Sequence, residues 1–214
     1  MSVARSKSIW PPPGRGIGRL VVEASRRAEA MGLVDPVAAP PAGSHPDPHR
    51  ELTTVRQIAR QAGRAGIATG MAAALHNVET PTPDELAALL KTMIAALEAS
   101  PVPKFEWSGL ARVFDPEPLA SLLQVSMSSL KRYQSGERST PDPIAARLHF
   151  LALVVGDLAG SYNDIGVRRW FQRKRTQLDG RAPAQLLTGE WDPDEPGPRR
   201  VRELARELVT LSAT

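Results

Sequence analysis

Apolar residues recur at intervals of three and four along most of the chain, which is the period of an amphipathic helix. Few segments alternate apolar and polar residues for long enough to form a strand. Scarce aromatic residues and abundant alanine also favour helices that pack through small side chains. The pattern therefore predicts an all-α protein, with helices over residues 19–31, 51–78, 83–98, 105–114, 144–158 and 201–213.

The helix over residues 83–98 has a clear capping signal at its start. Thr80 or Thr82 can cap it, and a proline can occupy its first turn. Asp84 and Glu85 suit the positive end of the helix. The glycines within residues 63–70 precede no Lys-Ser/Thr pair, so they do not form a phosphate loop, and we interpret them as sites of close helix packing.

The segment from Ile144 to Leu158 is the most hydrophobic helix that the pattern predicts. Apolar side chains lie nearly all round it, so the helix must be buried or paired. Two alternatives remain open from the sequence. It is either the spine of a homodimer or the central helix of one monomer.

The segment from Leu119 to Pro141 predicts two short helices joined by an abrupt turn. An apolar stripe lies on the first helix, and Ser126 is a suitable N-cap for the second. Leu130 and Tyr133, three residues apart, form the inner face of the second helix. Gly136 supplies its C-terminal stop.

Small polar and basic residues are left on the outer face of this second helix. Such a face is typical of a helix that enters the major groove of DNA, where it reads base edges. Nearby arginines, including those within residues 168–175, can meet phosphates or pair with acids elsewhere. A dimer would place two such helices about one DNA turn apart, roughly 34 Å. The candidate DNA-binding residues are Ser126, Met127, Ser128, Ser129, Lys131, Arg132 and Arg138.

Proline-rich stretches and changes of pattern divide the chain into four predicted parts. Residues 1–50 form a Pro-rich, largely disordered N-terminal segment that contains the short helix over 19–31. Residues 51–103 form a helical N-terminal region. Residues 104–160 form a helix-turn-helix domain, and residues 161–214 form a small helical C-terminal domain.

Charge is distributed unevenly, although the net charge is only +4. Residues 126–175 carry nine Lys or Arg against four Asp or Glu, whereas residues 190–214 carry six acids against four bases. This distribution permits nucleic-acid binding and suggests two partners of different chemistry. A solvated helical surface with local fluctuations in charge would give the same counts.

The residue types offer little support for catalysis or metal binding. Cysteine is absent, which excludes disulfides and thiolate metal sites. The histidines have neither metal-site spacing nor an obvious carboxylate partner; they are His45, His49, His76 and His149. With no nucleophile motif or acid–base pair, we expect no enzyme, no cofactor and no metal. Without a membrane span or a signal peptide, the expected location is the cytoplasm.

The segment over 165–187 reads IGVRRWFQRKRTQLDGRAPAQLL, and Trp170 and Phe171 follow an amphipathic stretch within it. The turn over 178–183 has the form Leu-x-Gly-Arg-x-Pro, and Leu186 and Leu187 follow. This order resembles the Xre/MbcA/ParS antitoxins, which join an Xre-like helix-turn-helix to a C-terminal toxin-binding domain. The resemblance covers roughly residues 107–211.

The resemblance implies a type II antitoxin that neutralises a RES-type, NAD-consuming toxin and binds its own operator, as a homodimer. The alternative is a stand-alone helix-turn-helix transcriptional regulator without a toxin. The implied toxin-binding residues are Trp170, Arg181, Arg202, Leu204, Leu208 and Leu211. Two interpretations of them stay open: these side chains contact the partner, or they specify the fold and close the protein's own core.

The chain also departs from this family in two places. The turn between the two short helices has Gln124 where a glycine is usual. If Gln124 adopts a left-handed conformation, the strain is on the order of 1 kcal/mol. The first hundred residues have no counterpart in the short members of the family.

Overall fold

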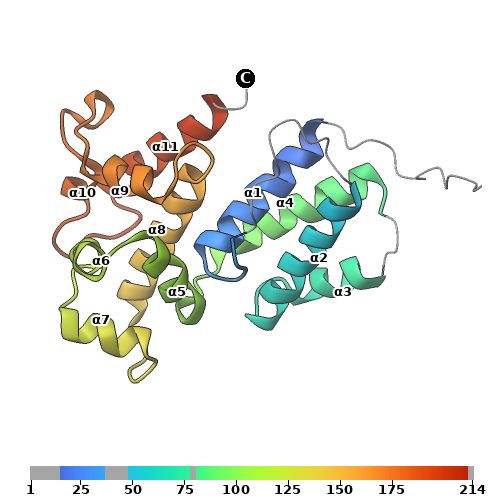
Figure 1. Ribbon diagram of the computed structural model, residues 1–214, viewed down its shortest axis with the longest axis horizontal. Coiled ribbons are helices and arrows are strands. Elements are labelled where there is room, and N and C mark those ends of the chain that lie inside the picture. The colour runs from blue at the N-terminus through green and yellow to red at the C-terminus, as the bar shows by residue number, and fades with distance from the viewer. Residues whose placement is uncertain (1–14, 37–47, 78–80, 212–214) are drawn as a thin grey trace, which may run out of the picture.

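The protein is all-α, as the sequence predicts (Figure 1). The computed structural model describes residues 15–36, 48–77 and 81–211, without the side chains of 15, 48–50, 72, 75–77 and 209–211. Those residues form no strand, and their helices are α1 (Arg15–Ala30), α2 (Pro48–Arg64), α3 (Thr69–Asn77), α4 (Pro83–Ala99), α5 (Pro103–Val113), α6 (Pro116–Leu123), α7 (Met127–Gln134), α8 (Asp142–Leu158), α9 (Asp164–Gln172), η1 (Thr176–Leu178), α10 (Pro183–Leu186) and α11 (Pro196–Leu211).

Helix α8 lies at the centre of the fold. Helices α1, α5 and α11 all pack on it, and every residue from Arg147 to Leu158 is buried. Its apolar sides are therefore covered within a single chain. Of the two alternatives for this helix, the structure supports the central helix of one monomer and not the spine of a dimer.

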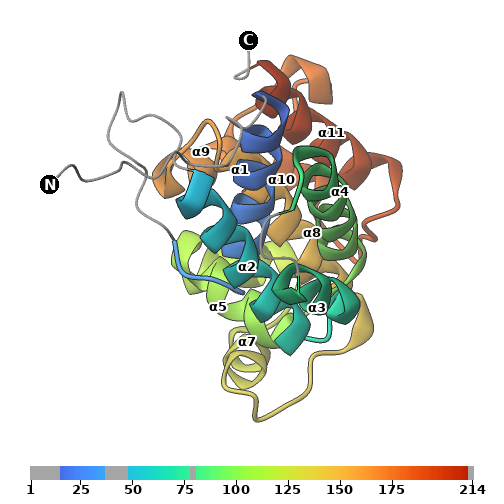
Figure 2. The ribbon, with the colours of Figure 1, turned by 90° about the vertical axis from the view of Figure 1, so that its right-hand side faces the viewer.

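Helix α1 belongs to the core. It begins four residues earlier than predicted and packs against α2, α4, α5 and α8 (Figure 2). Ala24, Ala28 and Met31 are completely buried. The predicted helix over 19–31 is thus confirmed. The expectation of disorder is wrong for residues 15–18, 32–36 and 48–50, and residues 1–14 and 37–47 lie outside the described residues. One continuous cluster of buried side chains runs from Ile17 to Ala205.

The capping signal before α4 is confirmed. Thr82 Oγ1 accepts a hydrogen bond from the Glu85 backbone N–H at 3.3 Å, and the Glu85 carboxylate accepts one from the Thr82 backbone N–H at 2.8 Å. This reciprocal pair satisfies two of the free donors at the helix start. Thr80 lies outside the described residues.

The predicted helix over 51–78 is divided into α2 and α3, and the glycine interpretation needs correction. Gly66 has a positive φ of 84° and ends α2, and open space surrounds both Gly66 and Gly70. Close helix packing at a glycine occurs at a different position in the chain. A side chain at Gly109 of α5 would overlap the carbonyl oxygen of Ala30, so this glycine allows α5 to meet the end of α1.

No single described helix is long and apolar enough to cross a membrane. Helices α4 and α5 together reach the required length and hydropathy, but the chain bends by 89° between them. Leu90 and Leu97 of α4 and Leu110 of α5 are completely buried in the core.

Candidate nucleic-acid interface

Residues 124–126 form the turn between α6 and α7. Gln124 is left-handed, with φ 57° and ψ 45°, and its side-chain amide donates a hydrogen bond to the Ser121 carbonyl. Ser126 caps α7, because its Oγ accepts a hydrogen bond from the Ser129 backbone N–H at 3.1 Å. The predicted helix, turn and capped second helix are therefore all present.

The inner face of α7 is firmly held. Leu130 is completely buried and Tyr133 is 7% exposed, as the spacing predicts. The Tyr133 ring stacks on Trp107 of α5, with ring centroids 6.0 Å apart. Trp107 Nε1 in turn donates a hydrogen bond to Thr140 Oγ1 at 2.9 Å, beyond the end of α7. Contacts on α5 and the following loop thus fix the orientation of α7.

The outer face of α7 presents Ser128, Lys131 and Arg132, all of which are exposed. Met127 is half-buried and packs against the core, so it is a weaker candidate for contact with a base. At the helix start, Ser126 Oγ lies 3.0 Å from Ser128 Oγ and 3.0 Å from Ser129 Oγ, within hydrogen-bond distance of both. The structure therefore places the predicted side chains on one small surface.

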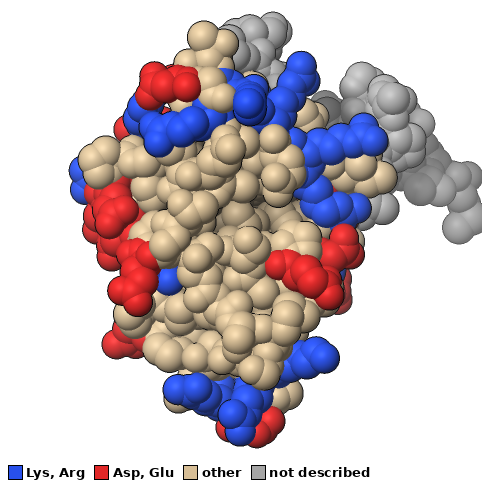
Figure 3. Space-filling view, turned by 90° about the vertical axis from the view of Figure 1, so that its left-hand side faces the viewer, with Lys and Arg blue, Asp and Glu red and all other residues tan. Residues whose placement is uncertain are grey.

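Basic side chains also follow α7. Arg132 Nε lies 3.1 Å from Glu137 Oε1, and both side chains are exposed. The Arg138 guanidinium lies 5.6 Å from the centre of the Tyr133 ring. In Figure 3, Lys and Arg gather at the lower end of the molecule, where α7 and its following loop lie, and again at the upper end.

The arginines within residues 168–175 divide into two groups. Arg168 donates a hydrogen bond to the Val113 carbonyl at 2.6 Å, and the Arg175 guanidinium lies 5.0 Å from the Trp170 ring centre. These two arginines hold the fold. Arg169, Arg173 and Lys174 are exposed and available to a partner.

The turn over 178–183 has the local geometry that its residues predict, with one correction. Gly180 has a positive φ of 75°, and Pro183 begins α10. Asp179, directly before Gly180, could accept backbone hydrogen bonds in such a turn, but its carboxylate accepts a hydrogen bond from Arg200 Nη1 of α11 at 2.7 Å. That hydrogen bond is the largest cause of the lowered pKa of Asp179.

Two of the predicted toxin-binding residues are not available to a partner. Trp170 is 1% exposed and packs edge-on against Phe171, and Leu204 is 6% exposed. Prediction of direct contact is therefore wrong for these two side chains in this conformation. Leu204 and Val201 of α11 close the protein's own core, which is the second interpretation that the sequence left open.

The remaining toxin-binding candidates differ in position. Arg181 is exposed on the turn before α10. Arg202 is half-buried, and its Nη2 lies 3.0 Å from Glu98 Oε1, so it serves an internal ion pair. Leu208 is half-buried against the core, and the side chain of Leu211 lies outside the described residues.

Sequence reasoning missed a carboxylate partner for one histidine. His149 Nδ1 lies 2.6 Å from Glu106 Oε1, and His149 Nε2 lies 2.9 Å from the Glu98 carbonyl oxygen. Burial raises the pKa of Glu106, and the contacts with His149 oppose that rise. Both side chains are buried, so we interpret the pair as part of the core. Among the described residues, no group of three or more His, Cys, Asp or Glu could hold a metal ion.

Trp191 was also missed, and it joins the C-terminal segment to the two short helices. Its Nε1 donates a hydrogen bond to the Leu122 carbonyl of α6 at 2.9 Å, and its ring meets Phe150 edge-on. Arg147 of α8 donates a hydrogen bond to the Trp191 carbonyl at 2.6 Å. Nothing in the local sequence predicts these partners.

The fold and the exposed α7 define an all-α protein with a candidate DNA-reading helix. The chain matches no protein-family model, no curated protein and no solved structure.

Proposed function

We propose that this protein binds double-stranded operator DNA by placing α7 in the major groove. One observation carries the proposal: the inner face of α7 is locked by Leu130 and Tyr133, while Ser128, Lys131 and Arg132 project outward. A rigid helix with short polar and basic side chains on its free face can approach base edges closely.

The side chains divide into two roles. Ser128, Lys131 and Arg132 would contact bases, because they lie on the free face of the helix. Arg138 would contact a phosphate beside the groove. To contact a base, Arg132 must break its ion pair with Glu137. This costs little free energy, because exposed ion pairs contribute at most about 1 kcal/mol to stability.

The test is a fluorescence-anisotropy titration of DNA from the promoter of the protein's own gene. Arg132→Ala should weaken binding by about 1–3 kcal/mol, which is roughly a tenfold to hundredfold rise in Kd. Lys91→Ala is the matched control, since Lys91 is an exposed cation on α4, away from α7. Equal affinity of the Arg132 variant and the control would contradict the proposal.

We further propose a homodimer on DNA. Two copies of α7 would then occupy half-sites roughly 34 Å apart. Footprinting should show two protected segments separated by about one helical turn, and a single short protected segment would contradict the dimer.

We propose that the protein is the antitoxin of a type II system and binds a RES-type toxin through residues 161–214. Support comes from the resemblance of residues 165–187 and from the exposed cations Arg169, Arg173 and Arg181. Co-expression with the product of the neighbouring gene should yield a complex that has lost toxicity. A stand-alone regulator, the second candidate, would have no RES-like neighbour and would form no such complex.

A further inference from the structure

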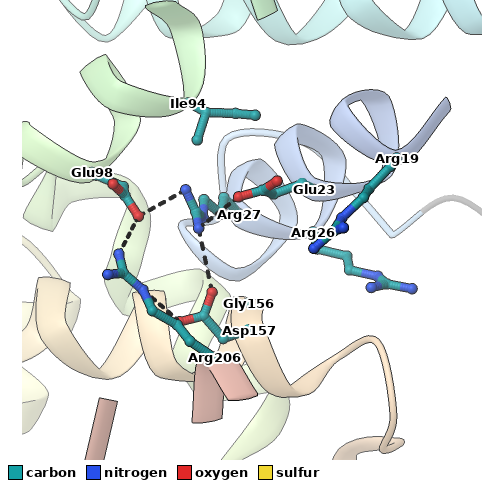
Figure 4. Close-up of a pocket in the computed structure, with 9 residues that line it drawn as sticks. All are labelled: Arg19, Glu23, Arg26, Arg27, Ile94, Glu98, Gly156, Asp157 and Arg206. Carbon is teal, nitrogen blue, oxygen red and sulfur yellow. Dashed lines mark hydrogen bonds and ion pairs between the residues drawn. The ribbon is translucent and has the colours of Figure 1, made fainter. Parts of the chain in front are cut away.

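A cavity of about 330 Å³ opens where α1, α4, α8 and α11 meet (Figure 4). Arginines and carboxylates line most of it, and Ile94 supplies its large apolar wall. A volume of this size lies at the small end of the range for small-molecule sites. The balance of charge within the cavity therefore decides what it can hold.

Three carboxylates at the cavity are already neutralised, chiefly by Arg27. This arginine is 5% exposed, and its guanidinium lies 2.9 Å from Glu23, 2.8 Å from Glu98 and 3.4 Å from Asp157. Its Nε atom is buried and makes no hydrogen bond within the described part of the chain.

Two arginines of α11 complete this neutralisation. Arg202 Nη2 lies 3.0 Å from Glu98 Oε1, and Arg206 Nε lies 3.7 Å from Asp157 Oδ2. Arg206 also pairs with Glu98. Three arginines thus match three acids, and the network holds α1, α4, α8 and α11 together around the cavity.

The cavity is also lined by Arg19 and Arg26, and the three carboxylates do not neutralise these two arginines. Neither forms a salt bridge with any residue that the structure describes, and in Figure 4 both lie to the right of the ion pairs that Arg27 makes with Glu98 and Asp157. Arg26 is half-buried against Gly160, which has no side chain to displace it. Burial lowers the pKa of Arg26, and the nearby charge of Glu29 opposes this. An unpaired, half-desolvated guanidinium would be stabilised by an anion.

We propose that this cavity binds a small multivalent anion, held by the guanidinium groups of Arg19 and Arg26. Guanidinium groups suit phosphate and carboxylate oxygens, because their planar donors match the geometry of both. The limited volume and the single large apolar wall favour a compact ligand, such as a phosphate ester or a polycarboxylate. The site lies apart from α7 and does not depend on DNA binding.

The experiment is isothermal titration calorimetry on the full chain at about 150 mM salt, where weak surface attraction is screened. Pyrophosphate and citrate are the two probes. Binding of pyrophosphate alone would identify a phosphate ligand, and binding of citrate alone would identify a carboxylate ligand. Arg26→Met and Arg19→Met should each weaken binding at least about tenfold.

Arg169→Met is the matched control, since Arg169 is an exposed arginine on α9 that does not line the cavity. It should bind the probe as tightly as the natural protein. Arg19 is exposed, so its substitution tests the site even if the Arg26 variant does not fold. The proposal is overturned if neither probe binds the natural protein, or if the Arg19 variant binds as tightly as the control.

Discussion

The Nδ1 atom of His149 lies 2.6 Å from Glu106 Oε1, between the central helix α8 and helix α5, with both side chains buried. Glu106 Oε2 makes no hydrogen bond there with any described residue. This oxygen of the carboxyl group is therefore removed from water on folding and accepts no hydrogen bond from a described residue in its place.

This geometry predicts a pH-dependent loss of stability. Burial raises the folded-state pKa of Glu106 above its ordinary value of 4.5, so the folded protein holds this proton more tightly than the unfolded chain does. The stabilisation that protonated Glu106 contributes is complete at pH values below the pKa that Glu106 has in the unfolded chain. It is lost as the pH rises through the higher pKa that Glu106 has in the folded protein. Because one proton is involved, the free energy of unfolding falls by at most about 1.4 kcal/mol per pH unit.

Glu106→Gln tests this dependence by urea denaturation between about pH 4 and about pH 6. The free energy of unfolding of the natural protein should fall relative to that of the variant as pH rises. Asp157, whose pKa burial also raises, is present in both proteins and cancels in the difference. A constant difference across this range would contradict the prediction.

Trp191→Ala should destabilise the protein by about 3–5 kcal/mol, because the indole fills space beside Phe150 and bonds to α6. Trp191→Phe retains an aromatic ring and removes the hydrogen bond to the Leu122 carbonyl. Its cost should be smaller, about 1–3 kcal/mol. Chemical denaturation measures both, and equal losses for the two variants would show that ring packing contributes little.

Arg27→Met should cost up to about 3–5 kcal/mol of unfolding free energy, because it removes the buried partner of Asp157 and Glu98 and leaves the buried Asp157 carboxylate with only the more distant Arg206. The double variant Arg27→Met/Asp157→Asn removes the most buried of those carboxylates. It should recover part of the loss. A double variant no more stable than Arg27→Met alone would argue that lost packing, not unpaired charge, causes the effect.

Gln124→Gly removes backbone strain of up to about 1 kcal/mol, because glycine adopts the left-handed conformation freely, and this gain should outweigh the exposed hydrogen bond to the Ser121 carbonyl that the glycine variant also loses. Gln124→Ala should destabilise it, since alanine keeps the strain and loses the hydrogen bond to the Ser121 carbonyl. Thermal denaturation should therefore rank the melting temperatures as glycine, then glutamine, then alanine. A glycine variant no more stable than the alanine variant would mean that the turn is not under strain, because both variants lack the hydrogen bond to the Ser121 carbonyl.

Signals within one or two helical turns could be predicted from the sequence. The reciprocal cap of Thr82 and Glu85, the cap of Ser126 and the buried pair Leu130 and Tyr133 are all present as expected. Each depends on residues close together in the chain, so spacing and residue type suffice to predict it.

Partners distant in sequence could not be predicted. Asp157 lies 130 residues from Arg27, and Leu122 lies 69 residues from Trp191. No periodicity encodes such pairings. The same limit explains the error at Leu204, because an apolar stripe on a helix has one pattern whether it closes the protein's own core or awaits a partner.

The position of α8 between α1 and α11 has a consequence for synthesis of the chain. The two helices that cover it come from opposite ends of the described sequence, so the core around α8 remains open until α11 has been synthesised. We therefore expect the core around α8 to close only when α11 docks on it, so that the N-terminal and C-terminal helices of the described sequence fold as one cooperative unit.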